Sequence, residues 1–154
     1  MTVYIDMDGV IADFESWIKT ILPDITEDDW RYSKGPWEVM DDNSDIVYRD
    51  LAPLHLLPHM NYLYNNLDDV VFLSAIPYQW CGTDKWDKAI SNKLHWLNNN
   101  IENFKSTDAI FTKGASDKLN YLISGDVLYD DREDTITKWN AAGGIGINVK
   151  GLPL

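Results

Sequence analysis

Short apolar runs alternate along this chain with longer stretches in which apolar residues recur every three or four positions. The runs, rich in Val, Ile, Tyr and Phe, predict buried strands, whereas the longer spacing predicts amphipathic helices. The predicted strands are residues 2–5, 70–74, 109–112, 127–129 and 145–149, and the predicted helices are residues 12–22, 56–67, 84–100, 117–123 and 135–142. Strands that alternate with helices favour an α/β fold with a Rossmann-like parallel sheet flanked by helices.

Residues 24–55 interrupt this alternation. They are rich in Asp, Trp and Tyr, and Gly35 and Pro36 stand in the middle of the segment. Acidic residues after Thr26 are typical of a helix start, because they complement the positive end of the helix dipole. We therefore expect one domain over residues 1–154, with residues 24–55 inserted as a small helical cap above the end of the first strand.

Composition limits the classes of partner. A formal net charge of −12 repels nucleic-acid backbones and anionic membranes, so an anionic substrate needs a local positive site. Cys81 is the only cysteine, which excludes an intrachain disulfide and favours a reducing compartment. No apolar run reaches about 18 residues and no basic and apolar leader is present, so we expect a cytoplasmic protein without membrane contact.

Polar residues that could carry chemistry follow three of the predicted strands. Asp6 and Asp8 follow the first strand, Ser74 ends the second, and Asp130 and Asp131 follow the fourth. The carboxyl ends of parallel strands meet at one edge of a sheet, where ligands bind in such folds. Neighbouring carboxylates repel one another unless a cation or a shared proton intervenes, so the pattern predicts a divalent metal.

The first motif has two other interpretations. Asp and Gly are ordinary turn residues, so an acidic turn is the simplest alternative. A calcium-binding loop also begins Asp-x-Asp, but it needs Gly at the sixth place and Glu at the twelfth. Counting from Asp6, these places hold Ile11 and Trp17, which excludes that loop.

The string Asp-Met-Asp-Gly-Val-Ile-Ala-Asp-Phe-Glu at residues 6–15 resembles the opening motif of the haloacid dehalogenase superfamily, and in particular of 5′(3′)-deoxyribonucleotidases. Ser74 resembles the second motif of that superfamily. Lys118 lies where the family places a lysine before the fourth motif, and residues 128–132 resemble that motif. The Trp-Asn-Ala-Ala-Gly-Gly string at residues 139–144 resembles the tail of the family, so the similarity spans nearly the whole chain.

The resemblance implies a set of roles for the acids. Asp6 would be the nucleophile, and Asp8 would protonate the leaving group and later activate water. Mg²⁺ would be held by Asp6, by the carbonyl group of Asp8 and by Asp131, with Asp130 as an outer partner. Which of Asp130 and Asp131 binds the metal directly stays open at the level of the sequence.

The resemblance also implies a phosphate site. The hydroxyl group of Ser74 and the ammonium group of Lys118 would hold the phosphoryl oxygens, although a strand-ending serine and a solvated lysine are the ordinary explanations. Lys113 is the rival lysine in the same stretch. Ala75 stands where relatives offer a second hydroxyl group, so recognition of phosphate and sugar at that position differs from the family.

Phe14 and Trp37 are the candidates for contact with a nucleobase, because the family presents aromatic residues at these places and stacking tolerates several bases. The three histidines match no metal-binding spacing. His95 lies in a predicted helix whose stripe is apolar, at Trp86, Ile90, Leu94 and Leu97, so we expect it in the core.

The predicted function is a magnesium-dependent 5′-nucleotidase for (deoxy)nucleoside monophosphates, in deoxyribonucleotide catabolism. A phosphatase for another small ester such as a sugar phosphate is the alternative within this fold. A binding module without catalysis and an interaction protein that uses the Trp-rich segment are alternatives of other classes. The expected partner is a small-molecule nucleotide and no nucleic-acid polymer, and a homodimer stays open.

Overall fold

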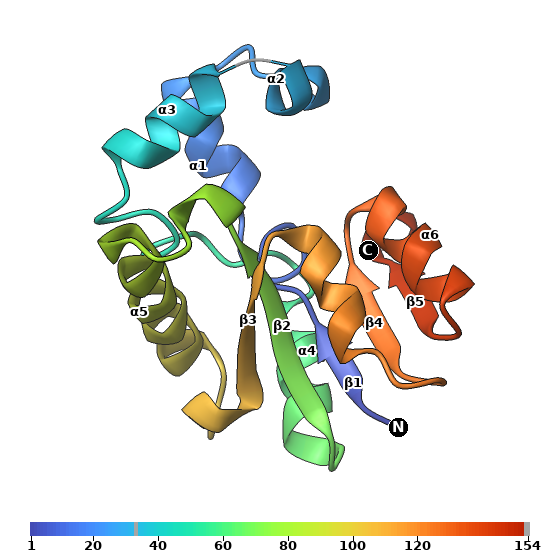
Figure 1. Ribbon diagram of the computed structural model, residues 1–154. Coiled ribbons are helices and arrows are strands. Elements are labelled where there is room, and N and C mark those ends of the chain that lie inside the picture. The colour runs from blue at the N-terminus through green and yellow to red at the C-terminus, as the bar shows by residue number, and fades with distance from the viewer. Residues whose placement is uncertain (33, 153–154) are drawn as a thin grey trace.

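Five parallel strands form the centre of the molecule (Figure 1). The computed structural model describes residues 1–32 and 34–152, and the sheet has the order β3-β2-β1-β4-β5. Every neighbouring pair is parallel, and Ile5 of β1 lies beside Phe72 of β2 and Tyr129 of β4. The strands are β1 (Val3–Ile5), β2 (Val70–Ile76), β3 (Ala109–Lys113), β4 (Val127–Asp130) and β5 (Ile145–Asn148). The predicted α/β fold with a parallel sheet is confirmed.

Helices cover both faces of the sheet and connect its strands. The α-helices are α1 (Phe14–Ile21), α2 (Glu27–Tyr32), α3 (Gly35–Asp42), α4 (Leu57–Asn66), α5 (Asp84–Asn100) and α6 (Glu133–Ala141). Short 3₁₀ helices are η1 (Tyr78–Trp80), η2 (Ser106–Asp108), η3 (Ala115–Tyr121) and η4 (Val149–Gly151). The limits of α5 are those predicted, whereas the predicted α-helix at residues 117–123 is the 3₁₀ helix η3. None of the helices in the described ranges is both long and apolar enough to cross a membrane.

Alternate residues of β1 point into two separate cores. Val3 and Ile5 pack with Phe72 and with the helices α4 and α5, while Tyr4 packs with Leu128 and Trp139 on the other face. This division follows from the alternation of side chains along an extended strand. Helix α4 accordingly lies behind the sheet in Figure 1, and η3, in orange, lies in front of it. Both faces of the sheet are covered, which explains why its strands are almost wholly apolar.

The helix after β1 begins later than predicted. Asp13 caps α1 by accepting a hydrogen bond from the amide group of Ser16, over 3.1 Å, so the helix starts at Phe14 and not at Ala12. An aspartate at this position satisfies an amide group that the first turn leaves without a partner. The residues before the cap remain available for a loop at the end of β1.

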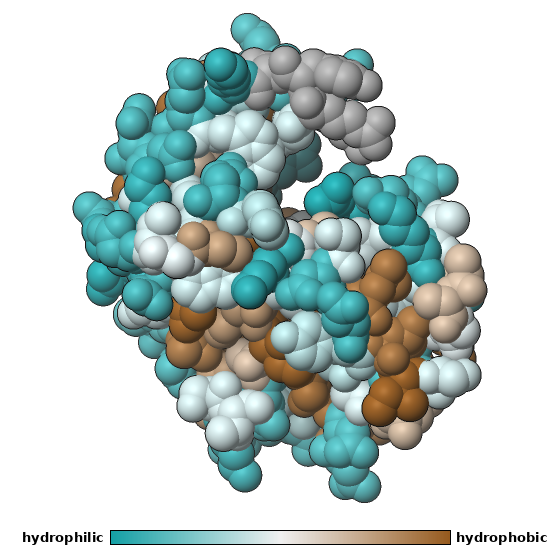
Figure 2. Space-filling view, viewed as in Figure 1, coloured by the Kyte–Doolittle hydropathy of each residue, from teal (hydrophilic) through white to brown (hydrophobic). Residues whose placement is uncertain are grey.

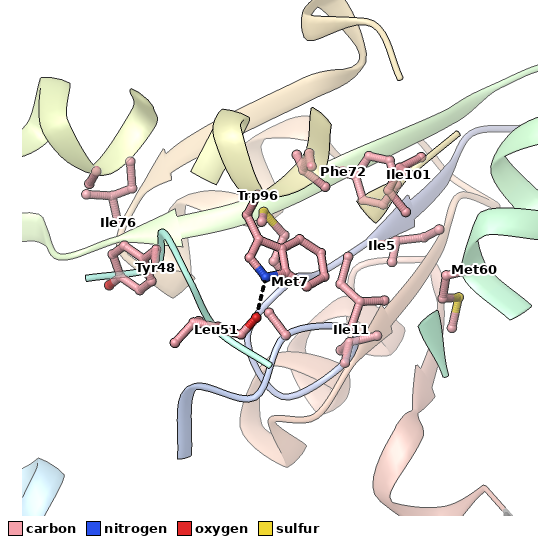
Figure 3. Close-up of a cluster of buried hydrophobic side chains, with 14 of the residues drawn as sticks. Ile5, Met7, Ile11, Tyr48, Leu51, Met60, Phe72, Ile76, Trp96 and Ile101 are labelled. Atoms are coloured by element: carbon pink, nitrogen blue, oxygen red, sulfur yellow. Dashed lines mark hydrogen bonds between the residues drawn. The ribbon is translucent and has the colours of Figure 1, made fainter. Parts of the chain in front are cut away.

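Helices α2 and α3 lie outside the sheet, beyond the carboxyl ends of its strands (Figure 1). The sequence predicts small helices in residues 24–55, and the structure has two there, α2 and α3. Residue 33 of this segment and residues 153 and 154 of the predicted domain lie outside the described residues. Side chains hold both α3 and the segment that returns from it to the sheet. The indole N–H of Trp80 donates to Asp41 over 2.6 Å, and that of Trp96 donates to the carbonyl group of Leu51 over 2.8 Å (Figure 3).

Candidate active site

A tight loop follows β1 and presents the first two acids. Three consecutive amide groups, those of residues 10–12, donate to the carbonyl oxygen of Met7 over 2.9 to 3.1 Å. Gly9 lies in this loop with a φ of +80°, a conformation that favours glycine. The chain therefore turns back immediately after Asp6 and Asp8, and leaves both carboxylates at the carboxyl end of β1.

Lys118 joins the first acid to an acid from β4. Its ammonium nitrogen lies 3.1 Å from Oδ1 of Asp6 and 2.8 Å from Oδ2 of Asp130. The Lys118 side chain is only 2% exposed, so this contact is shielded from water. Lys113, the rival lysine, is exposed at the end of β3. The structure thus brings Lys118, and not Lys113, to the acids.

Asp131 completes a cluster that could hold a metal ion. Oxygen atoms of Asp6, Asp130 and Asp131 all lie within 4.8 Å of one another. The carboxylate of Asp131 lies against the backbone of Gly9, in the space that a Cβ atom at position 9 would occupy. Carboxylate oxygens are the donors that Mg²⁺ and Ca²⁺ prefer, so the donor set fits a hard divalent cation. The chemistry of the three side chains does not by itself distinguish these metals.

The two acids at the end of β4 differ in their surroundings, and β4 runs one residue further than predicted, so that Asp130 is its last residue. Asp130 is fully buried, and both of its oxygens are engaged, one by Lys118 and the other by the amide group of Arg132 over 3.0 Å. Asp131 is only partly buried and faces Gly9. Asp131 is therefore better placed than Asp130 to offer an oxygen to a cation, while Asp130 holds Lys118.

The acids are electrostatically crowded. Burial raises the pKa of Asp6 well above its usual range, Lys118 opposes this shift, and Asp130, Asp131 and Asp8 add to it. Burial, followed by the charge of Asp130, raises the pKa of Asp131 to about 7. Burial would lower the pKa of Lys118, but Asp6 and Asp130 more than offset this and raise it. A cation at the cluster would relieve the repulsion that keeps protons on the acids.

A second buried lysine, Lys93, meets the other acid of the first motif. Its ammonium nitrogen lies 2.9 Å from Oδ2 of Asp8, 2.6 Å from the hydroxyl oxygen of Ser74 and 3.0 Å from the carbonyl oxygen of Ala75. It also lies 4.1 Å from the centre of the Tyr48 ring. Sequence reasoning missed Lys93 altogether.

The apolar stripe of α5 did not point to Lys93. The side chains that α5 buries are those of Ala89, Asn92, Lys93, Trp96 and Leu97, which recur at intervals of three and four. A lysine in that stripe has to be paired, because an isolated buried ammonium group is costly. The stripe predicted for this helix, Trp86, Ile90, Leu94 and Leu97, overlaps the buried one only at Leu97, because its other three members are only partly buried.

The structure changes the setting of Ser74 and Ala75. β2 does not end at Ser74 as predicted but continues to Ile76, and Ser74 is 1% exposed. The strand is longer because β3 pairs with it through residue 113. Ser74 nevertheless lies beside the first motif, because Lys93 bonds to both Ser74 and Asp8. The carbonyl group of Ala75, and no hydroxyl group, supplies the next contact to Lys93.

The aromatic candidates lie together above the sheet. The ring of Phe14 packs against Trp17, Trp30 and Tyr48, with centroid distances of 5.7 to 5.8 Å. Trp37 meets Trp30 edge to face at 5.2 Å, and its indole N–H donates to the carbonyl oxygen of Trp30 over 3.3 Å. Phe14 and Trp37 thus belong to one aromatic cluster that Trp30 bridges. Part of the Trp37 ring is used for packing within this cluster.

The histidines take no part in the site. The prediction that His95 lies in the core is wrong, because it is on the exposed side of α5 and contacts Asn99. His55 and His59 are exposed as well. In the part of the chain that the structure describes, the one group of His, Cys, Asp and Glu side chains close enough to hold a metal is that of Asp6, Asp130 and Asp131.

The molecular surface is hollowed between the α3 side and the α6 side of the molecule (Figure 2). The carboxyl ends of β1 and β4 point toward this side in the matching view of Figure 1. These two strands are neighbours in the sheet. After β1 the chain adds β2 and β3 on one side of β1, and it then returns to add β4 and β5 on the other side. Such a reversal of strand order is where open α/β sheets bind ligands.

Comparisons with known proteins do not assign the chain to a family. No family model matches it, and no curated protein matches it either. The function therefore has to be argued from the geometry of the acids, the two buried lysines and the aromatic cluster.

Proposed function

We propose that this chain is a Mg²⁺-dependent phosphomonoesterase of the haloacid dehalogenase type, acting on (deoxy)nucleoside monophosphates. One observation carries the proposal. Asp6, at the end of β1, is bound by the buried ammonium group of Lys118, which also binds Asp130, and Asp131 lies within 4.8 Å of both acids. An acid, a cation and a candidate metal site around one point are what a phosphate dianion needs for binding and attack.

In the proposed reaction, a carboxylate oxygen of Asp6 forms a bond to phosphorus while the bond from phosphorus to the leaving ester oxygen breaks. Asp8 gives a proton to that leaving oxygen. Asp8 then takes a proton from the water that attacks the aspartyl-phosphate, which releases phosphate and restores the Asp6 carboxylate. Both proton transfers use the same side chain, which explains why Asp8 follows Asp6 by two positions on a tight loop.

Two residues are proposed to bind the phosphoryl oxygens. Lys118 has three N–H donors and uses two of them on Asp6 and Asp130, so one is left for a phosphoryl oxygen. The hydroxyl group of Ser74 would be the other donor. Mg²⁺, held by Asp6 and Asp131 with the carbonyl group of Asp8, would supply charge that lessens the repulsion between the acids and the phosphate.

The substrate class rests on the aromatic cluster. Helices α2 and α3 would act as a cap, and Phe14 and Trp37 would contact the base. The hydrogen bond from Trp37 to Trp30 gives Trp37 a packing role, and this favours the second candidate function, in which Trp37 does not contact a base. In that case the enzyme would be a phosphatase for another small ester, such as a sugar phosphate, with the same acids and lysines.

Hydrolysis rates decide between these proposals. The eight common nucleoside 5′-monophosphates, a sugar phosphate and p-nitrophenyl phosphate are assayed with Mg²⁺ for the wild-type chain and for Asp6→Asn. We expect nucleotides to be the best substrates and Asp6→Asn to reduce hydrolysis to background. Asp68→Asn is the matched control, because Asp68 is an exposed acid just before the amino end of β2, whereas Asp6 follows the carboxyl end of β1. If Asp6→Asn keeps a tenth of the activity, about 1.4 kcal/mol of barrier or less, Asp6 is not the nucleophile.

A further inference from the structure

We infer that Lys93 is a positioning residue for proton transfer, which holds the carboxylate of Asp8 in place to give its proton to the leaving group. This inference rests on the proposed function and adds to it a residue outside the resembling motifs. Lys93 comes from the middle of α5 and its side chain is 0% exposed, so substrate and solvent do not reach it directly.

The donors of Lys93 are all in use. An ammonium group has three N–H donors, and Lys93 has three acceptors, Oδ2 of Asp8, the hydroxyl oxygen of Ser74 and the carbonyl oxygen of Ala75. The Tyr48 ring lies 4.1 Å away and adds a cation–π contact. Lys93 therefore has no donor left for a phosphoryl oxygen. This distinguishes it from Lys118, which retains one.

The contact with Asp8 treats its two oxygens differently. Oδ2 is bound by Lys93, whereas Oδ1 is, among the side chains that the structure describes, the one buried polar atom without a hydrogen-bond partner. A buried carboxylate oxygen without a partner is costly, so the bond from Lys93 to Oδ2 is the contact that holds this carboxylate in place. Because Oδ1 is enclosed, the exposed remainder of the Asp8 side chain, which is 26% exposed, is the part that can meet the ester oxygen or water of the proposed reaction.

The contact with Ser74 acts in the same direction. The Ser74 oxygen accepts from Lys93 over 2.6 Å, and an ammonium group can only donate. The hydroxyl hydrogen of Ser74 must therefore point away from Lys93. It is then available to a phosphoryl oxygen, so one lysine orients both a proton donor and a phosphate ligand.

The position of Lys93 is fixed by its neighbours on α5. Asn92 donates to the carbonyl oxygens of Asp45 and Val47 over 3.0 and 3.1 Å, and Trp96 donates to that of Leu51 (Figure 3). These bonds join α5 to the segment that returns from α3. Helix α5 is thus anchored just before and just after Lys93. A side chain held in this way can keep a carboxylate within the narrow limits of position that proton transfer needs.

The test uses the dependence of the rate on the leaving group. Lys93→Met keeps the length of the side chain and removes its charge and donors. We expect turnover of alkyl phosphates, whose leaving oxygen needs a proton, to fall about a hundredfold, and that of p-nitrophenyl phosphate to fall less than about tenfold. Lys88→Met on the same helix is the control, because Lys88 pairs with Asp45 and Asp84, away from Asp8 and Ser74, and is 44% exposed. Ser74→Ala should slow both kinds of substrate alike, since it removes a phosphate ligand.

A double-mutant cycle assigns the effect to Asp8. In the Asp8→Asn background, Lys93→Met should not change the preference between the two kinds of ester any further. Equal losses for alkyl and nitrophenyl esters in Lys93→Met, or a preference that still changes in the Asp8→Asn background, would overturn the positioning role while the proposed function stands. A wild-type chain that hydrolyses no phosphate ester overturns both.

Folding is checked separately, because Lys93→Met leaves Asp8 without its charged partner. Lys93→Gln keeps one N–H donor for Oδ2 and should recover part of the alkyl phosphate turnover. The double variant with Asp8→Asn removes both charges and should fold. If the double variant folds and neither single variant does, Lys93 is a structural partner of Asp8 and the positioning role is overturned.

Discussion

The carboxylate of Asp131 packs directly on the Cα atom of Gly9, so that the residue after β4 occupies the space left by a missing side chain in the loop after β1. Position 9 favours glycine for two separate reasons. Its φ of +80° is strained for other residues, and any Cβ atom would overlap the Asp131 carboxylate. The two motifs therefore fit each other sterically.

Gly9→Ala should separate these two effects. The backbone strain costs about 1–2 kcal/mol of folding stability. The added methyl group should displace the Asp131 side chain, so the protein should still fold but lose its Mg²⁺-dependent hydrolysis. Gly82→Ala is the matched control, since Gly82 has a φ of +75° and open space where its Cβ atom would be. It should lose a similar stability, measured by thermal unfolding, and keep its activity. Full activity in Gly9→Ala would show that the position of Asp131 is unimportant.

Lys118→Met should abolish hydrolysis and lower stability. The substitution leaves two buried carboxylates, Asp6 and Asp130, without their shared cation, and breaking a buried ion pair in this way typically costs about 3–5 kcal/mol. Lys113→Met is the control, because Lys113 is exposed at the end of β3. Steady-state rates and chemical denaturation measure both effects. Comparable losses in the two variants would contradict the central place of Lys118.

The response to magnesium should depend on pH. The pKa of Asp131 is raised to about 7, so the folded metal-free protein retains a proton that the unfolded chain loses near pH 4. Its stability should therefore fall as the pH rises from about 4 to about 7. Mg²⁺ displaces that proton, so it should raise the melting temperature more at pH 8 than at pH 6. Asp131→Asn should lessen this difference, and an equal Mg²⁺ effect at both pH values in the wild-type chain would contradict the displacement of a proton by the metal.

Removing the metal should also remove activity. EDTA followed by dialysis should abolish hydrolysis, and Mg²⁺ should restore it. Ca²⁺ should restore it poorly, because its larger and less regular coordination shell suits in-line attack less well. Undiminished hydrolysis after dialysis against EDTA would show that the acid cluster works without a metal.

Trp37→Ala should test the base contact. A lost stack is worth on the order of 1–3 kcal/mol, so catalytic efficiency for deoxynucleotides should fall about ten- to a hundredfold. p-Nitrophenyl phosphate has no base, and its hydrolysis should change much less. Equal losses for both substrates would mean that Trp37 serves mainly to pack on Trp30, as its edge-to-face contact and hydrogen bond allow. Unchanged rates for both would place the base elsewhere.

Much of the fold could be predicted from local patterns. The apolar runs were sufficient to predict all five strands, and the spacing of apolar residues was sufficient to predict where α5 begins and ends. Boundaries were less certain where a local interaction decides them, as at Asp13, which caps α1 two residues later than predicted. The 3₁₀ form of η3 also escaped prediction, because its residues suit either kind of helix.

The sequence by itself determined that Asp6, Asp8, Asp130 and Asp131 follow buried strands, and in a parallel sheet that is enough to bring them to one edge. Only the tertiary structure decided which groups neutralise these acids. Lys93 is 85 positions from Asp8, and His95, two positions further, faces solvent. Periodicity shows that a helix has a buried side, but the rotation of the helix against the sheet depends on how all its side chains pack together. That rotation turned Lys93 inward to Asp8 and Ser74, and no local pattern specifies it.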